Sequence, residues 1–226
     1  MSGISRADRV IGVVLILVLA GLTGLGLSQN RSSEHSPLSG ATTLSSSPPV
    51  TAAPVTTVPP APTTTTSTLP RAIAGPVTAV GDSIMLDIQP DLTVDVPGVQ
   101  VDGLVSRQFE AGIAVVPADR AAGTLGKVLV VELGTNGTVT SSDVDAMVQA
   151  AAGVSRIVFV NVCVPRPWAA SDNAVLAAGV ARYPGLAVLA DWNTLATPHP
   201  EWFTADQVHL NPDGAAALAA LIAKYT

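Results

Sequence analysis

Short apolar runs alternate with segments of helical composition over residues 71–226, and this alternation most limits how the chain can fold. The apolar runs are residues 77–80, 99–101, 128–133, 157–162 and 186–189. The segments of helical composition are residues 110–122, 142–152, 172–183 and 212–225. Strands that alternate with helices favour a parallel sheet covered on both faces. Because crossovers between parallel strands are right-handed, we expect an α/β fold, a flavodoxin-like three-layer α/β/α sandwich with a five-stranded parallel sheet.

The first 27 residues predict a membrane segment. Arg6 and Arg9 precede residues 10–27, a run that contains no charged residue. At ~1.5 Å per residue, such a helix barely spans a bilayer core of about 30 Å. The flanking arginines favour a cytoplasmic N-terminus and an extracytoplasmic remainder, anchored to the cell membrane by a single pass. A cleaved signal peptide, which would release a secreted protein, is the alternative; the long run and the lack of an Ala-x-Ala site favour the anchor.

Residues 28–70 predict a disordered linker. They consist mainly of Ser, Thr, Pro, Ala and Val, with almost no charge and no aromatic residue. Such a composition cannot bury enough apolar surface to fold, and its prolines favour an extended conformation. Fully extended at ~3.1 Å per residue, the linker would reach on the order of 130 Å, enough to place a domain of residues 71–226 within a cell wall.

Charge and residue counts narrow the classes of function. The formal net charge of −6 argues against a nucleic-acid partner. The single cysteine, Cys163, excludes an intramolecular disulfide bond. The chain has three histidines, His35, His199 and His209, and no cluster of Cys and His. We therefore expect no protein-bound metal and no cofactor.

Ser83 is the candidate nucleophile. It lies in the sequence Gly81-Asp82-Ser83, directly after the apolar run 77–80. Residues at the carboxyl ends of strands in an open α/β sheet face the crevice where such folds bind ligands. Taken alone, Gly-Asp-Ser is also a common turn sequence, and a turn is its more frequent role.

Asp206 and His209 could activate that serine. A hydroxyl needs a base beside it, and the base needs a third group that fixes its tautomer and stabilises the imidazolium. Asp206 and His209 are three positions apart on a loop. The Asp206 carboxylate can therefore turn toward Nδ1 of His209 and leave Nε2 for Ser83. Two surface residues that happen to be neighbours are the alternative. Asn211-Pro212 favours an ordered site, because Asn is a good N-cap and Pro is preferred at the first helical position.

Asn136 is the candidate side-chain donor to an oxyanion. The apolar run 128–133 is followed by Gly134-Thr135-Asn136-Gly137. Acyl transfer through a tetrahedral intermediate requires fixed hydrogen-bond donors, and an Asn amide on a glycine-flanked loop is one common choice. An ordinary turn is the alternative for this tetrapeptide.

Together these motifs resemble the SGNH (GDSL-like) hydrolase superfamily, whose order along the chain they follow. More narrowly, residues 76–226 resemble the extracytoplasmic SGNH domain of bacterial cell-wall O-acetyltransferases. The residues that carry this narrower likeness are Gly81-Asp82-Ser83-Ile84-Met85, Ser106-Arg107-Gln108, the segment Asn161-Val162-Cys163-Val164-Pro165-Arg166-Pro167-Trp168, and Asp191-Trp192. The resemblance implies the three-layer sandwich and an oxyanion hole formed by Ser83, Ser106 and Asn136. The family usually has a glycine where Ser106 stands; Gly103 is the alternative in a register shifted by three.

The resemblance implies a serine esterase or O-acyltransferase that works through an acyl-enzyme on Ser83. The expected partners are an acyl ester donor, a wall-glycan acceptor and a separate membrane protein that delivers acyl groups. Arg107, Gln108 and Trp168 are candidates for substrate binding. A solvated loop pair is an equal alternative for the first two, and core packing for Trp168. A non-catalytic wall-binding module on an anchored stalk is the competing function.

Overall fold

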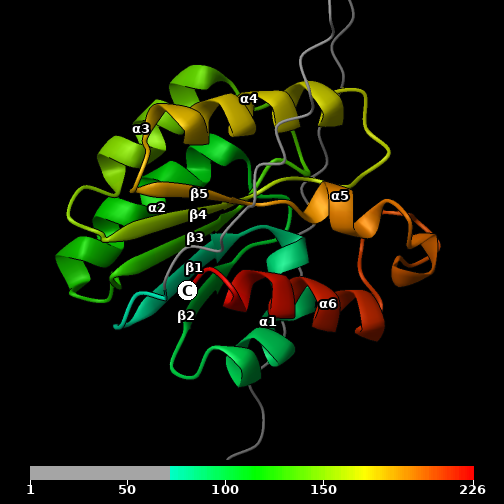
Figure 1. Ribbon diagram of the computed structural model, residues 1–226, viewed down its shortest axis with the longest axis horizontal. Helices are drawn as coiled ribbons and strands as arrows, with labels where there is room; N and C mark the ends of the chain where they lie inside the picture. Colours follow the sequence, from blue (N-terminus) through cyan, green and yellow to red (C-terminus); the bar gives the residue numbers. More distant parts are fainter. Residues whose placement is uncertain (1–71) are drawn as a thin grey trace, which may run out of the picture. The chain divides into compact units, whose positions relative to one another are not determined.

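The computed structural model describes residues 72–226, which contain a five-stranded, fully parallel sheet. The strand order is β2-β1-β3-β4-β5 (Figure 1). The strands are β1 (Val77–Gly81), β2 (Gln100–Gly103), β3 (Val128–Glu132), β4 (Arg156–Val160) and β5 (Ala187–Ala190). The prediction of a five-stranded parallel sheet is therefore confirmed, with each strand within two residues of its expected bounds.

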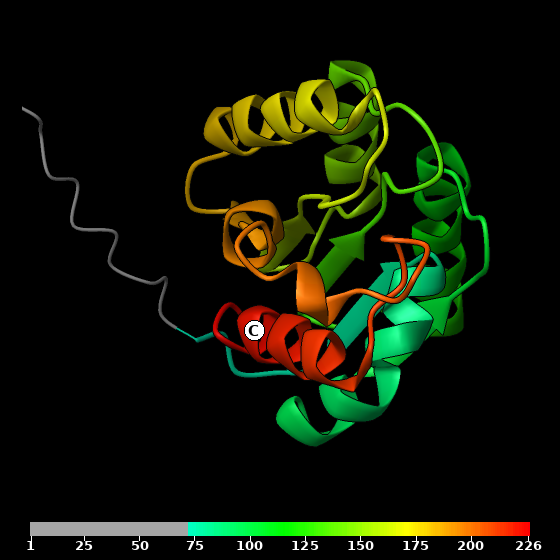
Figure 2. The same cartoon turned by 90° about the vertical axis from the view of Figure 1, so that its right-hand side faces the viewer.

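Helices cover both faces of this sheet (Figures 1 and 2). One face carries α1 (Ser83–Asp95), α5 (Trp192–Ala196) and α6 (Pro212–Ala223). The other face carries α2 (Phe109–Ala122), α3 (Ser141–Ala150) and α4 (Ala169–Arg182). A short 3-10 helix, η1 (Pro200–Trp202), lies between α5 and α6. The layers are those of the predicted α/β/α sandwich.

The central strands supply the two cores because their side chains point alternately to opposite faces. In β3, Val128 and Val130 pack in the core beneath α1 and α6. Leu129 and Val131 pack in the core beneath α2, α3 and α4. Every residue of β1, β3 and β4 is buried, which explains why these strands are mostly apolar in the sequence.

Helix α1 was not predicted, yet it begins at the candidate nucleophile. Asp82 caps it by accepting a hydrogen bond from the backbone N–H of Ile84 at 2.9 Å. Pro90 lies inside the helix, where it removes one backbone donor and normally disfavours helical structure. Burial of Ile88 and Leu92 beneath the sheet compensates for this local weakness.

The sheet order places the candidate site at a point where the chain changes direction. From β1 the chain moves to β2 on one side, and it then returns to β3 on the other side. Ligands of open α/β sheets bind in the crevice that opens at the carboxyl ends of such strands. Ser83 follows β1 and Asn136 follows β3, so both residues lie at this edge.

The predicted anchor (residues 1–27) and linker (residues 28–70) lie outside the described residues. Between residues 72 and 226, no helix is both long and apolar enough to cross a bilayer.

Candidate active site

The site is built on two segments from opposite ends of the domain, and the first is the start of α1. Ser83 is the first residue of this helix, so its backbone N–H has no acceptor within the helix. Its residue surface is only 9% exposed. Asp82, fully buried beside it, holds the turn between β1 and α1 in place through its bond to Ile84.

The second segment is the loop from Phe203 to Asn211. Phe203 and Leu210 form an isolated antiparallel bridge, and the N–H of Thr204 donates to the carbonyl of His209 at 2.8 Å. Asn211 caps α6 by accepting from the N–H groups of residues 213 and 214, and Pro212 is the first helical residue. The sequence prediction that His209 lies just before the last helix is confirmed.

Asp206 organises this loop from its centre. Its Oδ1 accepts hydrogen bonds from the Thr204 hydroxyl at 2.7 Å and from the N–H groups of Val208 and His209 at 2.9 and 3.0 Å. Its Oδ2 lies 2.7 Å from Nδ1 of His209. These four hydrogen bonds hold the pKa of Asp206 far below its usual range, and the bond to the His209 side chain has the largest effect. Asp206 is therefore a carboxylate.

His209 joins the two segments. Its Nε2 lies 3.1 Å from Oγ of Ser83. Because the Asp206 carboxylate accepts at Nδ1, the neutral imidazole carries its proton there and presents Nε2 as an acceptor for the serine hydroxyl. The pKa of His209 is raised, mainly by the hydrogen bond to Asp206. Partial burial lowers this pKa, and the negative charges of Asp87, Asp206 and Asp82 raise it further.

Asp87 is a site residue that sequence reasoning missed. Its Oδ2 accepts a hydrogen bond of 3.0 Å from the backbone N–H of Leu210, the residue after His209. Asp87 lies one helical turn after Ser83 on α1, so one helix carries both the serine and the anchor of the histidine loop. The signal was the spacing of four between Ser83 and Asp87, which has meaning only once this segment is known to be helical.

Asn136 lies between the loops that carry the other expected oxyanion donors. Its Nδ2 donates to Oδ2 of Asp82 at 3.0 Å and makes a longer contact of 3.5 Å with the carbonyl of Arg107. One N–H of the amide is therefore bonded to the residue before Ser83. The loop starts at Gly134, whose φ of 126° is a conformation that other residues rarely adopt.

Ser106 has a left-handed backbone, with φ of 60°. It is exposed in the loop between β2 and α2, and its N–H donates no hydrogen bond to any residue among 72–226. Gly103, the alternative position, is the last residue of β2 and is paired with Gly81 of β1. A left-handed conformation is the one that glycine adopts most easily, which explains why a glycine would suit position 106.

The three residues expected to bind substrate all have partners within the protein. The guanidinium of Arg107 is buried and donates to the carbonyls of Gly81 at 3.1 Å and Asp102 at 2.6 Å, and to the Asp102 carboxylate at 2.7 Å. The exposed Gln108 donates to the carbonyl of Asn136 at 2.8 Å. The half-buried Trp168 donates from Nε1 to the carbonyl of Gly134 at 3.0 Å. These contacts brace the loops around the site.

Glu132 lies at the end of β3 and is 4% exposed. Its Oε2 has no hydrogen-bond partner among the described residues. A Cβ built on Gly81 would lie 3.0 Å from this oxygen, so the carboxyl group sits directly against the turn that precedes Ser83. Burial, and then the nearby charge of Asp82, raise the pKa of Glu132 well above its usual value.

Several known proteins are similar in sequence to this chain, although no protein-family profile matches it. YrhL of Bacillus subtilis (strain 168) is 38% identical over 153 residues, or 68% of this chain. The peptidoglycan O-acetyltransferase OatA of Listeria monocytogenes is 33% identical over 153 residues, and the O-acetyltransferase OatA of Staphylococcus aureus is 33% identical over 146 residues. The chain spans 24% of the length of each of these relatives.

Solved structures show the same fold. The C-terminal catalytic domain of Streptococcus pneumoniae peptidoglycan O-acetyltransferase A, with a methylsulfonyl adduct, matches with a TM-score of 0.61 at 24% identity, covering 68% of this chain and 93% of that one. TesA matches at 0.55 with 18% identity, covering 65% and 95%. A lipolytic G-D-S-L family member from Veillonella parvula matches at 0.51 with 16% identity, covering 65% and 94%. The described residues therefore share the fold of a peptidoglycan O-acetyltransferase catalytic domain and of a lipolytic G-D-S-L family member, and peptidoglycan O-acetyltransferases are among the homologues of the chain.

Proposed function

We propose that this protein is a serine esterase or O-acyltransferase that forms an acyl-enzyme on Ser83. The observation that carries the proposal is the unbroken hydrogen-bonded series Asp206–His209–Ser83, with distances of 2.7 and 3.1 Å. A carboxylate, an imidazole and a hydroxyl in this order form the arrangement that activates serine nucleophiles on several unrelated folds. The O-acetyltransferase homologues support acetyl esters as the acyl donors.

In the first half of the reaction, His209 removes the Ser83 proton as Oγ attacks the ester carbonyl. Asp206 stabilises the imidazolium that forms and keeps its Nδ1 in place. The N–H groups of Ser83 and Ser106 and the Asn136 amide donate to the oxyanion. The helix dipole of α1 favours negative charge at the same place. His209 then protonates the leaving alcohol, and the acyl group stays on Oγ.

In the second half, His209 takes a proton from an incoming hydroxyl, which attacks the acyl carbon. Water as the acceptor makes the protein an esterase, whereas a sugar hydroxyl makes it an O-acyltransferase. The peptidoglycan O-acetyltransferases among the homologues favour a wall glycan as the acceptor. Gln108 and Trp168 are candidates to contact it at the rim of the site, whereas the buried contacts of Arg107 assign that residue to bracing the turn before Ser83.

The N-terminal part of the chain supports a place of action outside the cell. An uncleaved apolar segment at residues 10–27 would anchor the protein, and the Ser/Thr/Pro-rich linker would let the domain reach the wall. In this arrangement a separate membrane protein supplies the acyl groups. Protease accessibility of the domain in intact cells tests the proposed orientation.

Replacing the nucleophile is the most direct test of the chemistry. Ser83→Ala should abolish the burst of product from a chromogenic acetyl ester and the labelling by a serine-directed sulfonyl fluoride, while the thermal unfolding curve stays unchanged. In the wild-type protein, mass spectrometry should find the acetyl adduct on the peptide that contains Ser83. Undiminished turnover in the folded variant would exclude Ser83 as the nucleophile. A wild-type protein that takes no label would instead support a wall-binding module without activity.

A further inference from the structure

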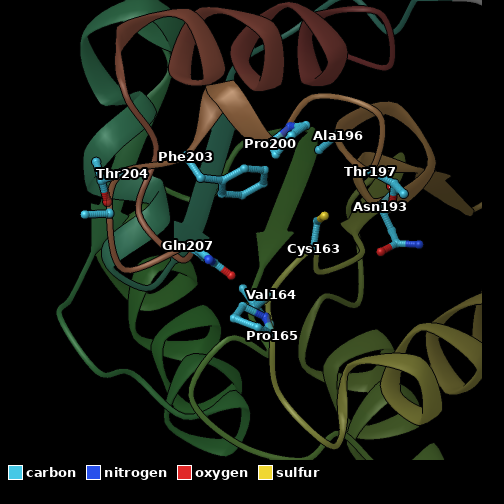
Figure 3. A pocket seen from close by; sticks show the side chains of 11 residues that line it. Cys163, Val164, Pro165, Asn193, Ala196, Thr197, Pro200, Phe203, Thr204 and Gln207 are labelled. Carbon is cyan, nitrogen blue, oxygen red and sulfur yellow. The ribbon is translucent and has the colours of Figure 1, made fainter.

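A cavity of about 510 Å³ lies beside the histidine loop, and nothing in the proposed acyl-enzyme chemistry uses it (Figure 3). We call it the Gln207 cavity. One wall is the segment after β4, and the other walls are α5, η1 and the loop that follows them. Its lining residues are Cys163, Val164, Pro165, Asn193, Ala196, Thr197, Pro200, Phe203, Thr204, Ala205 and Gln207. The volume lies in the range of ligand-binding pockets, roughly 300–1,000 Å³, and is larger than an acetyl group needs.

The cavity shares its wall with the catalytic loop. Thr204 and Gln207 line it, and they lie two positions before and one position after Asp206, whose Oδ1 accepts a hydrogen bond from the Thr204 hydroxyl. Gln207 has φ of 59°; it and Ser106 are the two non-glycine residues with positive φ between residues 72 and 226. A left-handed conformation at a residue other than glycine costs free energy, and such residues gather at binding and catalytic sites. Figure 3 shows the Gln207 side chain directed toward Val164 and Pro165 across the cavity.

The lining suits an uncharged ligand that has both polar and apolar faces. No Asp, Glu, Lys, Arg or His lines the cavity, and burial raises the pKa of the Cys163 thiol, which keeps it neutral. The side-chain amides of Asn193 and Gln207 make no hydrogen bond to any residue in the described part of the chain. Each amide can donate and accept. Phe203, Val164 and Pro165 supply apolar surface between them.

We propose that the Gln207 cavity is the acceptor subsite, which holds an uncharged, N-acetylated sugar ring of the glycan that receives the acyl group. The carboxamides of Asn193 and Gln207 pair with the acetamido and hydroxyl groups, and Phe203 contacts the apolar face of the ring. This inference rests on the acyl-enzyme proposed above. In the transfer step, a sugar hydroxyl oxygen bonds to the acyl carbon as the bond from that carbon to Ser83 Oγ breaks. The hydroxyl proton passes through His209 to Oγ.

Binding can be measured without chemistry in the full-length Ser83→Ala protein, with tri-N-acetylchitotriose, called chitotriose below, as the probe. Adding Asn193→Ala or Gln207→Ala should weaken chitotriose binding about tenfold each, which corresponds to the loss of a hydrogen bond of roughly 1.4 kcal/mol. Gln89→Ala, which removes an exposed amide on α1 away from the cavity, is the matched control and should leave the affinity unchanged. Equal affinity in the Ser83→Ala parent and in all three double variants would overturn the assignment.

Catalysis with intact Ser83 then separates this inference from the acyl-enzyme proposal. With a chromogenic acetyl ester as the donor and chitotriose as the acceptor, Asn193→Ala and Gln207→Ala should lower the ratio of acetylated sugar to free acetate about tenfold by raising the acceptor KM. If the variants instead alter the preference between acetyl and hexanoyl esters, the cavity holds the acyl chain and the inference is wrong. If the serine-directed sulfonyl fluoride does not label Ser83 in the wild-type protein, the acyl-enzyme proposal is wrong. The chitotriose affinities would still decide what the cavity binds.

Discussion

Nε2 of His209 lies 3.1 Å from Oγ of Ser83, although 126 positions separate the two residues in the chain. The contact depends on two attachments of the histidine loop. Asp206 holds the imidazole from within the loop, and Asp87 of α1 holds the backbone of Leu210. The serine and its base are thus positioned relative to a single helix, and variants of these attachments test the arrangement.

Asp206→Asn should reduce turnover by about 10⁴-fold, because a neutral amide neither fixes the imidazole tautomer nor stabilises the imidazolium. His209 acts as a base only when it is neutral. Because its pKa is raised above the usual value of about 6.5, activity should begin to fall above that pH as the pH is lowered. Without the carboxylate this pKa is lower, and the acid limb of the profile of kcat/KM against pH should move to lower pH. Hydrolysis of an acetyl ester measured from pH 4 to 9 checks both effects. An acid limb that stays in place would contradict the coupling.

Asp87→Ala should lower kcat/KM by about 10²-fold, because release of the Leu210 backbone allows the imidazole to move away from Ser83. Asp87→Asn retains an acceptor oxygen and should recover most of this loss, although the pKa of His209 should fall with the missing charge. Asp91→Ala, one turn further along α1, is the matched control. Equal kinetics for the Asp87 and Asp91 alanine variants would show that the attachment has no effect on catalysis.

Asn136→Ala should cost about 10²–10³-fold in turnover if its amide donates to the oxyanion. The same change removes a donor from the buried Asp82 carboxylate, so the free energy of unfolding should fall by about 1–3 kcal/mol. Gln108→Ala removes the contact of an exposed side chain with the Asn136 carbonyl. In hydrolysis of an acetyl ester with no glycan present, it should have a much smaller effect on both quantities. Steady-state kinetics and urea unfolding of both variants measure the contrast, and similar losses in the two would argue against a direct role for the Asn136 amide.

Glu132→Gln should make the protein more stable at neutral and alkaline pH than the wild type. Burial raises the pKa of Glu132 in the folded state, so the folded protein holds a proton that the unfolded chain releases near pH 4.5. The free energy of unfolding of the wild type therefore declines as the pH rises from this value toward the raised pKa. Glutamine, which does not ionise, removes the decline. Thermal unfolding at several pH values tests this, with the exposed Glu110→Gln as the control, and parallel profiles for wild type and Glu132→Gln would refute it.

Local pattern predicted the sheet and most helices because burial of a strand on both faces leaves an apolar run, as in β3 and β4. Helix α1 was not predicted because Pro90 and the short apolar face of the helix weaken the helical pattern in the sequence. Packing against the sheet stabilises the helix instead. The solvated-loop alternative for Arg107 does not hold, since its guanidinium is buried against Gly81 and Asp102. Gly81 lies on β1, 26 positions before Arg107, so no local pattern could have indicated that contact.

The sequence by itself determined the alternation of strands and helices and the chemistry-bearing residues at the ends of strands, because both depend on neighbours a few positions away. Only the tertiary structure decided that Asp87 anchors the histidine loop, that Asn136 bonds to Asp82, and that a cavity opens beside Gln207. The bond between Asn136 and Asp82 depends on the pairing of β3 with β1, and the bond between Asp87 and Leu210 depends on the packing of α1 against α6. These hydrogen bonds join residues more than 50 positions apart, and they form only when the whole sheet and its helices are assembled. No short stretch of sequence can therefore predict them.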